Sequence, residues 1–547
     1  MTSNPRRAPA LLAPALLATL AVALAVPAAA QGQPDPVDRS RLPSLTPAVF
    51  ESRGTVSVEL PVVNRQPLSG FGPPPRTYVV PADRQAVTRP FAPDLDRLPA
   101  LAFAPPPEPA GDDRALRRFR AEAGGGAQSG RYGRLDLSGV GASGEFFVDA
   151  DYDGADGGSD RVRFDRLDVR AGGRSFGRGR LRLEGFAALD GYATPAAIVT
   201  ARRQRRSLGA EAGVEGLGAV PYALTVGFEQ SQLSRTNDAE PETNEGRVDA
   251  TARASLFQNR LRADAAGGLA GSGGFGNDVQ YGAAGLAVAL DRADGARLVL
   301  GARALGYSAS ATAGGGDGQA VGAILDLRLP LGTNRLFVTN DPHLAVRSLY
   351  DLTADNPFVR PDPIVVPDVV PVDFRVGVEL RPGPARARGY GLLMYAPTFL
   401  AFEQAGGAFG ETYVQATVYG VGGDLTVAAA SGTTASLGLE LRRGTSDGGD
   451  DIPFFAPVVA RAGVQVPVAD GRGRVGLSAR GESARPADRA GVLDAGAWGV
   501  LALDARYDVR GPFSVVLRGE RLVGEAERWP GSPEPPYTVM LGLRLSR

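Results

Sequence analysis

Apolar and polar residues alternate with a period of two along most of the chain after about residue 116. The clearest run is RVDATARASL at residues 247–256, where Val, Ala and Leu share one face and Arg, Asp, Thr and Ser share the other. Residues 372–380 and 501–509 repeat the pattern. Successive side chains of a strand point to opposite sides, so these runs predict β-strands with one apolar and one polar face. Each run has about the ten residues that a tilted strand needs to cross a hydrocarbon layer.

Short Gly, Asn or Asp connections join many of these runs, as at Gln258-Asn259 and Arg510-Gly511. Longer polar connections are expected at residues 231–245, 308–319, 443–451 and 483–494. The runs number roughly 16 to 22, and the total should be even in a barrel with short turns on one side and longer loops on the other. Residues 339–371 contain six prolines, which predicts a loop or an interrupted strand there.

The composition of the two faces separates a membrane barrel from a soluble sandwich. The polar faces are dense in Arg, Asp and Glu, while the apolar faces consist mostly of Ala, Gly, Leu and Val. Such apolar faces suit lipid tails better than a closely packed core. The predicted fold is therefore an all-β, transmembrane, antiparallel up-and-down β-barrel. In its clearest strand, the residues predicted to face lipid are Val248, Ala250, Ala252 and Ala254, and those predicted to face the lumen are Arg247, Asp249 and Arg253.

Aromatic side chains near the predicted strand ends are candidates for the girdles of a membrane barrel. The expected girdle residues are Tyr132, Tyr152, Tyr281, Tyr307, Trp498, Phe513 and Tyr537.

The N-terminal part of the chain has a different composition and lacks the period-two pattern. Arg6 and Arg7 precede an apolar run at residues 11–26 that ends in Ala28-Ala29-Ala30. This pattern predicts a secretory signal peptide over residues 1–30. Residues 31–115 are Pro-rich and predict an extended periplasmic or lumenal segment, which leaves residues 116–547 for the barrel.

The composition narrows the chemistry further. The chain has no Cys and one His, and all 59 basic residues are arginine, because the sequence contains no Lys. The absence of Cys excludes thiolate metal sites and Cys nucleophiles. The net charge is −1, which gives no sign of a nucleic-acid partner.

Several short motifs resemble those of a known class of barrel. The chain ends on an alternating run at residues 537–547, although it closes on Arg547 instead of an aromatic residue. Residues 119–126 look like a first strand that follows the Pro-rich segment of residues 31–115, which we call the lead-in. Residues 340–344, NDPHL, look like an N-P-x-L turn. The layout resembles plugless, TonB-dependent-receptor-like outer-membrane β-barrel proteins. That resemblance implies an outer-membrane location, contact with outer-membrane lipid and the barrel-assembly machinery, and a transport or transport-accessory role.

The same resemblance raises the question of energy coupling. Thr55, Val56, Ser57 and Val58 are similar to a TonB box, the stretch through which an energy-coupling periplasmic partner binds. The alternative interpretation, which we favour, is an ordinary extended patch. Residues 60–120 are too short and too rich in Pro to predict a plug domain, so the lead-in is expected to be extended.

One acidic motif has the spacing of a calcium-binding loop. Asp149, Asp151 and Asp153 precede Gly154, and Asp160 stands at the twelfth position. The flanking sequences predict strands instead of helices. The alternative is a hairpin whose acidic residues share one strand face and continue into a solvated turn, and we favour it. No other cofactor is expected.

The functional hypotheses come from three classes. The first is a non-enzymatic barrel of the TonB-dependent-receptor-like type with unknown cargo. The second is a passive porin-like channel. The third is an outer-membrane hydrolase that uses His343 with Asp341 and Ser348, but the sequence contains no nucleophile elbow near them. We favour a structural role for His343 and predict that the protein is not an enzyme.

Overall fold

The computed structural model describes residues 116–546, except 142, 156–163, 177–178, 194–201, 218–219, 236–242, 258–259, 274–276, 293–294, 311–315, 357, 360–364, 406–407, 521–528 and 530–537. The predicted signal peptide, the Pro-rich lead-in and the TonB-box-like residues Thr55, Val56, Ser57 and Val58 therefore lie outside the described residues. So does Asp160 of the calcium-loop motif.

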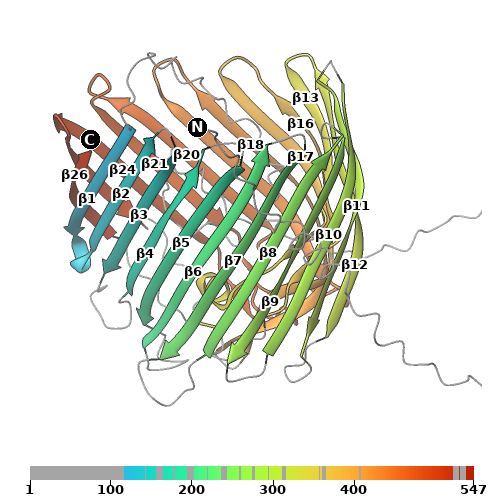
Figure 1. The fold of residues 1–547 in the computed structure, drawn as a ribbon. Helices are drawn as coiled ribbons and strands as arrows, with labels where there is room; N and C mark the ends of the chain where they lie inside the picture. Colours follow the sequence, from blue (N-terminus) through green and yellow to red (C-terminus); the bar gives the residue numbers. More distant parts are fainter. Residues whose placement is uncertain are drawn as a thin grey trace, which may run out of the picture. The chain divides into compact units, whose positions relative to one another are not determined.

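Twenty-two strands form the wall, each hydrogen-bonded antiparallel to its neighbours in the chain (Figure 1). The first eleven are β1 (Leu116–Gly126), β2 (Arg131–Gly141), β3 (Gly144–Ala155), β4 (Phe164–Ser175), β5 (Gly179–Ala193), β6 (Arg202–Leu217), β7 (Pro221–Arg235), β8 (Thr243–Leu256), β9 (Leu261–Gly273), β10 (Asn277–Asp291) and β11 (Arg297–Ala309). The other eleven are β12 (Asp317–Leu331), β13 (Asn334–Asn340), β16 (Val372–Leu380), β17 (Ala385–Ala405), β18 (Ala408–Ala428), β19 (Thr434–Ser446), β20 (Val458–Val468), β21 (Gly473–Glu482), β24 (Trp498–Arg510), β25 (Phe513–Glu520) and β26 (Thr538–Ser546).

The barrel closes where the first and last strands pair, from Arg120↔Ser546 to Gly126↔Met540. The predicted all-β, antiparallel up-and-down barrel is therefore confirmed, with a strand number at the upper end of the expected range. The remaining described elements are small: η4 (Ala127–Ser129), β14 (His343–Ala345), α2 (Leu349–Asp355), β15 (Asp368–Val370), β22 (Arg485–Pro486) and β23 (Asp494–Ala495). No helix in the described part of the chain is both long and apolar enough to cross a membrane.

The two ends of the barrel differ in their connections. At one end the turns are tight, and Gly332 and Gly511 adopt φ of +65° and +57° there, which a residue without a Cβ accommodates freely. The barrel begins and ends at this short-turn end. The opposite end carries the longer connections, and we call it the long-loop end. In outer-membrane barrels the short turns are periplasmic and the longer loops are extracellular.

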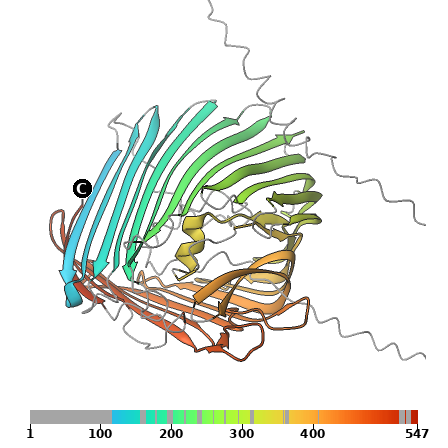
Figure 2. The same ribbon diagram turned by 90° about the horizontal axis from the view of Figure 1, so that it is seen from below.

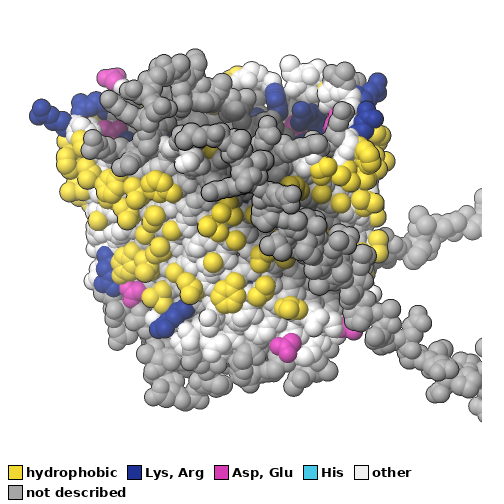
Figure 3. Space-filling view, viewed as in Figure 1, with side chains coloured by type: hydrophobic (Ala, Val, Ile, Leu, Met, Phe, Trp, Pro, Cys, Tyr) yellow, Lys and Arg dark blue, Asp and Glu magenta, His cyan; other side chains and the backbone are white. Residues whose placement is uncertain are grey.

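Side-chain exposure follows the predicted alternation. Val248 is 47% exposed, whereas its neighbours Arg247 and Asp249 are 4% and 9% exposed. On the face shown in Figure 3, apolar side chains cover the wall, and charged side chains gather toward its two ends. The outer surface is therefore apolar where lipid tails would contact it, and the polar faces point into the lumen.

A pair of neighbouring substitutions tests this orientation. Ala252→Arg places a charge on the lipid-facing side of β8 and should cost about 2–4 kcal/mol if the residue lies near the bilayer midplane. Arg253→Ala changes an exposed lumenal side chain and should cost less. Urea-induced unfolding in lipid vesicles measures both, and equal losses of unfolding free energy would show that the two faces are assigned wrongly.

Two expectations about the strand ends are wrong. The strands extend into three of the four predicted long connections. β7 continues to Arg235 and β8 begins at Thr243, β11 and β12 leave only residues 310–316 between them, and β19 continues to Ser446. A polar sequence continues a strand wherever the strand projects beyond the lipid into water. Several predicted girdle aromatics instead face the lumen and are buried: Tyr132, Tyr281 and Trp498.

The lumenal aromatics contact arginines, which explains their orientation. Arg518 lies 4.6 Å from the ring centre of Tyr132, and Arg480 lies 5.7 Å from that of Trp498. A guanidinium over an aromatic ring is attracted to the electron-rich face of the ring. The arginine-rich lumen therefore binds aromatic side chains that would otherwise lie at the lipid interface.

Candidate functional site

The lumen is crossed by the chain between β13 and β16. β13 has 7 residues and β16 has 9, whereas the flanking strands β12 and β17 have 15 and 21. Pro342 follows the end of β13 and Pro371 directly precedes the beginning of β16. Proline cannot donate to a strand ladder. We call the described residues of 341–371 the inner segment. Figure 2 shows its helix α2, in yellow, inside the ring of strands.

Helix α2 is short and is fixed by its caps. The Ser348 side chain accepts a hydrogen bond from the Asp351 amide, and Asp351 bonds back to the Ser348 amide, which forms a capping box. The Asn356 amide donates to the Leu352 carbonyl at the other end. The first-turn amide of Leu349 donates to the Glu245 carboxylate of β8 at 3.1 Å. The wall thus supplies an acceptor for a helical amide that has no partner within the helix.

A buried carboxylate on β5 also holds the helix. Asp190 of β5 lies 2.7 Å from Arg166 and 2.5 Å from Arg205, and it accepts a hydrogen bond from the Tyr350 hydroxyl at 3.0 Å. Arg205 also lies 5.0 Å from the ring centre of Tyr350. Two guanidinium groups and one hydroxyl therefore converge on one carboxylate, which links the helix to β4, β5 and β6.

The residues after the helix contact the same part of the wall. Arg203 of β6 donates to the Val359 carbonyl at 2.5 Å, and its side chain is fully buried. The ring of Phe358 meets that of Tyr192 edge to face, with 6.4 Å between ring centres. Hydrogen bonds from a charged donor are stronger than neutral ones, so Arg203 is a substantial anchor.

The first residues of the inner segment, 341–342, are held by a second set of ion pairs. Arg303 of β11 lies 3.0 Å from Asp264 and 2.8 Å from Asp341, and it also donates to the Pro342 carbonyl. Burial raises the pKa of the Asp341 carboxyl above its ordinary value, and the nearby Arg303 charge opposes this effect. The charge of Arg303 thus keeps the turn at residues 341–342 in place.

A third ion pair joins the two halves of the inner segment to each other and to β17. Arg347 lies 2.6 Å from the buried Asp368, whose carboxylate also accepts a hydrogen bond from the Leu400 amide at 2.7 Å. Asp368 begins β15, which pairs with β14 and, at Val369↔Thr398, with β17. The inner segment is therefore a small folded unit attached to the edge of β17.

Apolar contacts fill the space between this unit and the wall. Leu344 and Val366 pack against the lumenal side chains Val279 and Tyr281 of β10. The Tyr413 hydroxyl of β18 accepts a hydrogen bond from the Val366 amide at 2.9 Å. The inner segment is held by burial as well as by charge, so it is packed in the lumen.

Aromatic rings from several connections meet at the long-loop end. Phe409 and Trp529 have ring centres 5.3 Å apart, and Phe454 lies 4.6 Å from Trp529. Phe402 lies 5.4 Å from Trp529, and Phe358 of the inner segment belongs to the same cluster. These five rings, which we call the aromatic cluster, join the inner segment to residues of β17, β18 and the connections after β19 and β25.

The lumen is not polar on all sides, contrary to the simple alternation. The sector from β13 to β20 carries a buried apolar cluster on its lumenal face, which includes Phe337, Tyr390, Leu392, Met394, Ala396, Phe399, Val414, Val418, Ile452 and Phe455. The sequence carries one indication of this apolar lumenal face, because residues 392–395, LLMY, do not alternate between apolar and polar. A strand that is apolar on both faces is covered on both faces, by lipid outside and by protein inside.

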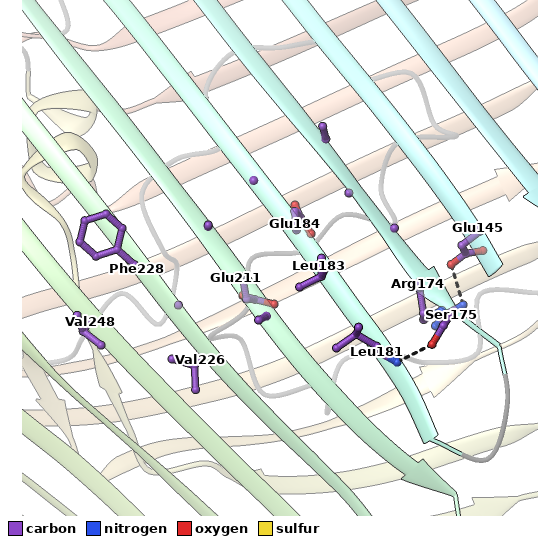
Figure 4. A pocket seen from close by; sticks show the side chains of 17 residues that line it. Glu145, Arg174, Ser175, Leu181, Leu183, Glu184, Glu211, Val226, Phe228 and Val248 are labelled. Atoms are coloured by element: carbon purple, nitrogen blue, oxygen red, sulfur yellow. Dashed lines mark hydrogen bonds and ion pairs between the residues drawn. The ribbon is translucent and has the colours of Figure 1, made fainter. Parts of the chain in front are cut away.

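A shallow groove on the outer wall is a separate feature (Figure 4). Its lining includes the exposed side chains Leu183, Val226, Phe228 and Val248, which point to the lipid side of β5, β7 and β8. Glycine and alanine residues between them leave the surface hollow. The groove is apolar and lies on the opposite side of the wall from the lumenal ion pairs, so it is not part of this site.

The calcium-loop motif lies mostly within a strand. Asp149, Asp151 and Asp153 occupy alternate positions of β3 and share its lumenal face, where Arg134 lies 3.0 Å from Asp151. Alternate residues of a strand are about 6.6 Å apart, so an extended strand does not converge three carboxylates on one ion. Among the described residues, no group of three His, Asp or Glu side chains is placed to hold a metal. Calcium binding through Asp160 stays a prediction.

The three side chains of the hydrolase hypothesis have separate partners. His343 Nδ1 lies 2.9 Å from the Asp341 carbonyl oxygen, while the Asp341 carboxylate pairs with Arg303. The Ser348 hydroxyl accepts the capping hydrogen bond of α2. The geometry is that of a turn and a helix cap.

Solved structures with the same fold place this barrel among known proteins. The copper transporter OprC matches with a TM-score of 0.60 and 13% identity, over 80% of this chain and 81% of that one. The FrpB iron transporter from Neisseria meningitidis (F3-3 variant) matches with a TM-score of 0.61 and 12% identity, over 79% and 82%. The siderophore receptor PiuA from Acinetobacter baumannii matches with a TM-score of 0.60 and 10% identity, over 79% and 82%.

The fold is thus that of TonB-dependent-receptor barrels, and it carries the apolar outer face of an outer-membrane protein. No protein-family model and no curated protein sequence matches the chain. The absence of a plug stays a prediction, because the lead-in lies outside the described residues.

Proposed function

We propose that this protein is an outer-membrane transport barrel whose lumen is gated by the inner segment. The observation that carries the proposal is the attachment of the inner segment to the wall across the lumen, at Asp190, Arg203 and Glu245. A closed barrel of this size without an internal element would leave a wide aqueous channel. Charged and aromatic anchors that can be released together suit a gate.

The solved structures with the same fold support a transport role, since their titles describe copper, iron and siderophore transport or reception. The cargo of this chain is unassigned. As the finer part of the proposal, an energy-coupling periplasmic partner would bind the lead-in at Thr55, Val56, Ser57 and Val58 and drive release of the inner segment. Binding of a synthetic peptide with the sequence of residues 51–60 to such a partner tests this part.

Conductance in planar bilayers tests the gate. The intact protein should show small or no steps, because the inner segment crosses the lumen. Replacement of residues 343–369 by a short Gly-Ser linker should give large stepwise conductance, because a lumen of this diameter conducts ions freely once it is empty. The control is Arg253→Ala, which removes an exposed lumenal charge and leaves the inner segment in place, so its conductance should stay small.

A passive porin is the second candidate, favoured only by the polar lumenal face of β1 to β8. It makes the opposite prediction for the same experiment, because the intact protein would already conduct in large steps. Heat-modifiable migration on gels verifies that the deletion variant still forms a barrel. A folded deletion variant that conducted no better than the intact protein would contradict the proposed gate.

A further inference from the structure

The wall contains a seam between β12 and β17. β12 pairs with β13 only from Leu331 to Leu325, where the partner of Leu325 is Asn340. Its long-loop half, residues 317–324, pairs with β11 on one side and, in the described part of the chain, has no strand on the other. β17 likewise loses β16 beyond Tyr395, where Thr398 pairs with β15 and the Leu400 and Gln404 amides donate to Asp368 and to the Ala487 carbonyl. The seam therefore has one edge, that of β12, without a neighbouring strand in the described part of the chain, and a second edge, that of β17, which contacts the inner segment instead of β16.

The two edges overlap instead of meeting. The Thr398 hydroxyl of β17 lies 3.4 Å from the Tyr307 hydroxyl, which points into the lumen from β11. Tyr413 of β18 packs with Val279 and Tyr281 on the lumenal face of β10. The long-loop ends of β17 and β18 have therefore turned inward, behind β10 to β12, and they hold the inner segment against the inside of the wall.

The face that packs inward has the parity of a lipid-facing surface. Tyr419 and Val421 of β18 are exposed on the outer wall, and Tyr413 shares their face because it lies an even number of residues away. Leu344 continues β13 in the same way: if the β12–β13 register is extended, Leu344 comes opposite Val321. Val321 points outward and is 73% exposed. The apolar face of the inner segment therefore fits the wall as well as it fits the lumen.

The unpaired edge of β12 is costly where it faces lipid. The Ala323 carbonyl accepts a hydrogen bond from the Asn340 side-chain amide, but residues 317–322 have no neighbouring strand on this side in the described part of the chain. Backbone groups without partners are costly in hydrocarbon, and barrels normally avoid them by complete pairing. A strand that completes the ladder would remove this cost. The residues that follow β13 in the chain are the nearest available strand, and they already form β14.

We propose that the exposed edge of β12 is a docking site for β14 of the same chain. In the closed state, β14 pairs with β15 inside the lumen. In the open state, residues 343–346 lie along β12 in the register of β13, beyond Pro342, which has no N–H to donate to the ladder. Leu344 then faces Val321, the seam closes and the inner segment leaves the lumen. The proposal rests on the proposed gate and specifies where β14 binds when the gate opens.

A disulfide between positions 321 and 344 detects the docked state, because the chain contains no native Cys. In the closed structure Val321 points outward and Leu344 packs against the lumenal face of β10, so Val321→Cys with Leu344→Cys should remain unlinked while the gate is closed. In the open state the two positions are direct cross-strand neighbours and should form a disulfide under oxidation. Release of the helix by Asp190→Ala should increase the rate of linkage about tenfold or more, since each 1.4 kcal/mol of anchoring corresponds to a factor of ten.

Two control pairs define the result. Leu300→Cys with Leu325→Cys lie opposite each other on β11 and β12 and should link at the same rate with and without Asp190→Ala. Val321→Cys with Ala345→Cys is out of register and should remain unlinked. If the first pair fails to fold, Gln319→Cys with Val346→Cys tests the same register.

The linked protein should show stepwise conductance that a reductant abolishes. Failure of both in-register pairs to link, while Leu300→Cys with Leu325→Cys links, would overturn the docking proposal. So would a linked protein that conducts no more than the unlinked one. The deletion of residues 343–369 tests the gate separately, so a conducting deletion variant with unlinkable pairs would leave the gate intact and reject only its docking on β12.

Discussion

Asp190→Ala is expected to cost about 3–5 kcal/mol of the free energy that holds the inner segment in the lumen. The substitution leaves Arg205, which is nearly fully buried, without the carboxylate 2.5 Å away, and Arg166 without its pair at 2.7 Å. It also removes the acceptor of the Tyr350 hydroxyl. An uncompensated buried guanidinium costs more than the loss of the pair itself.

Limited proteolysis within residues 343–369 of the detergent-solubilised protein measures this effect as a higher cleavage rate. The matched control is Asp508→Ala, which breaks an ion pair with Arg506 at a position where both side chains are more than a third exposed. That pair should contribute at most about 1 kcal/mol. Equal cleavage rates in the two variants would show that Asp190 does not hold the inner segment. In the double variant Asp190→Ala with Arg205→Met, protection should return in part, because no buried charge is left unpaired.

Phe409→Ala is expected to destabilise the aromatic cluster by about 3–5 kcal/mol, the usual cost of truncating a fully buried aromatic residue. Phe409 is fully buried and contacts both Trp529 and Phe454. Its loss leaves a cavity where the connections of the long-loop end meet, so they should separate while the barrel stays closed.

Faster proteolytic cleavage of residues 521–537, with an unchanged temperature of heat-modifiable migration, would show this local effect. Phe257→Ala is the control, because Phe257 is 74% exposed in a short turn at the opposite end. A Phe409→Ala variant that is cleaved no faster than the control would mean that the aromatic cluster does not hold these connections together.

Local sequence patterns specify the architecture of the wall. A period-two pattern such as residues 247–256 fixes which side chains share a face, and the outward exposure of Val248 beside the buried Arg247 confirms it. The short turn at Gly511 follows from local chemistry in the same way, because a residue without a Cβ accommodates a positive φ. These features depend on residues that are near each other in the chain, which is why sequence patterns reveal them.

The path of residues 341–371 was predicted only in part. The prolines correctly indicated an interrupted strand, since Pro342 and Pro371 stand where β13 ends and just before β16 begins. Nothing in these residues indicated that the chain turns into the lumen. A loop with several apolar residues looks the same in a sequence whether it covers a barrel or enters it.

The charged residues of the candidate site come together only when the barrel closes. Asp190, Arg203 and Glu245 look like any other residues on the polar strand faces, and their partners Tyr350, Val359 and Leu349 lie more than 100 positions away. The same holds for Tyr132 and Trp498, whose arginine partners on other strands turned them from the lipid interface to the lumen. A strand pattern specifies a face, but the closure of the barrel brings distant faces together. The attachment of the inner segment therefore depends on the closed ring and not on any single strand.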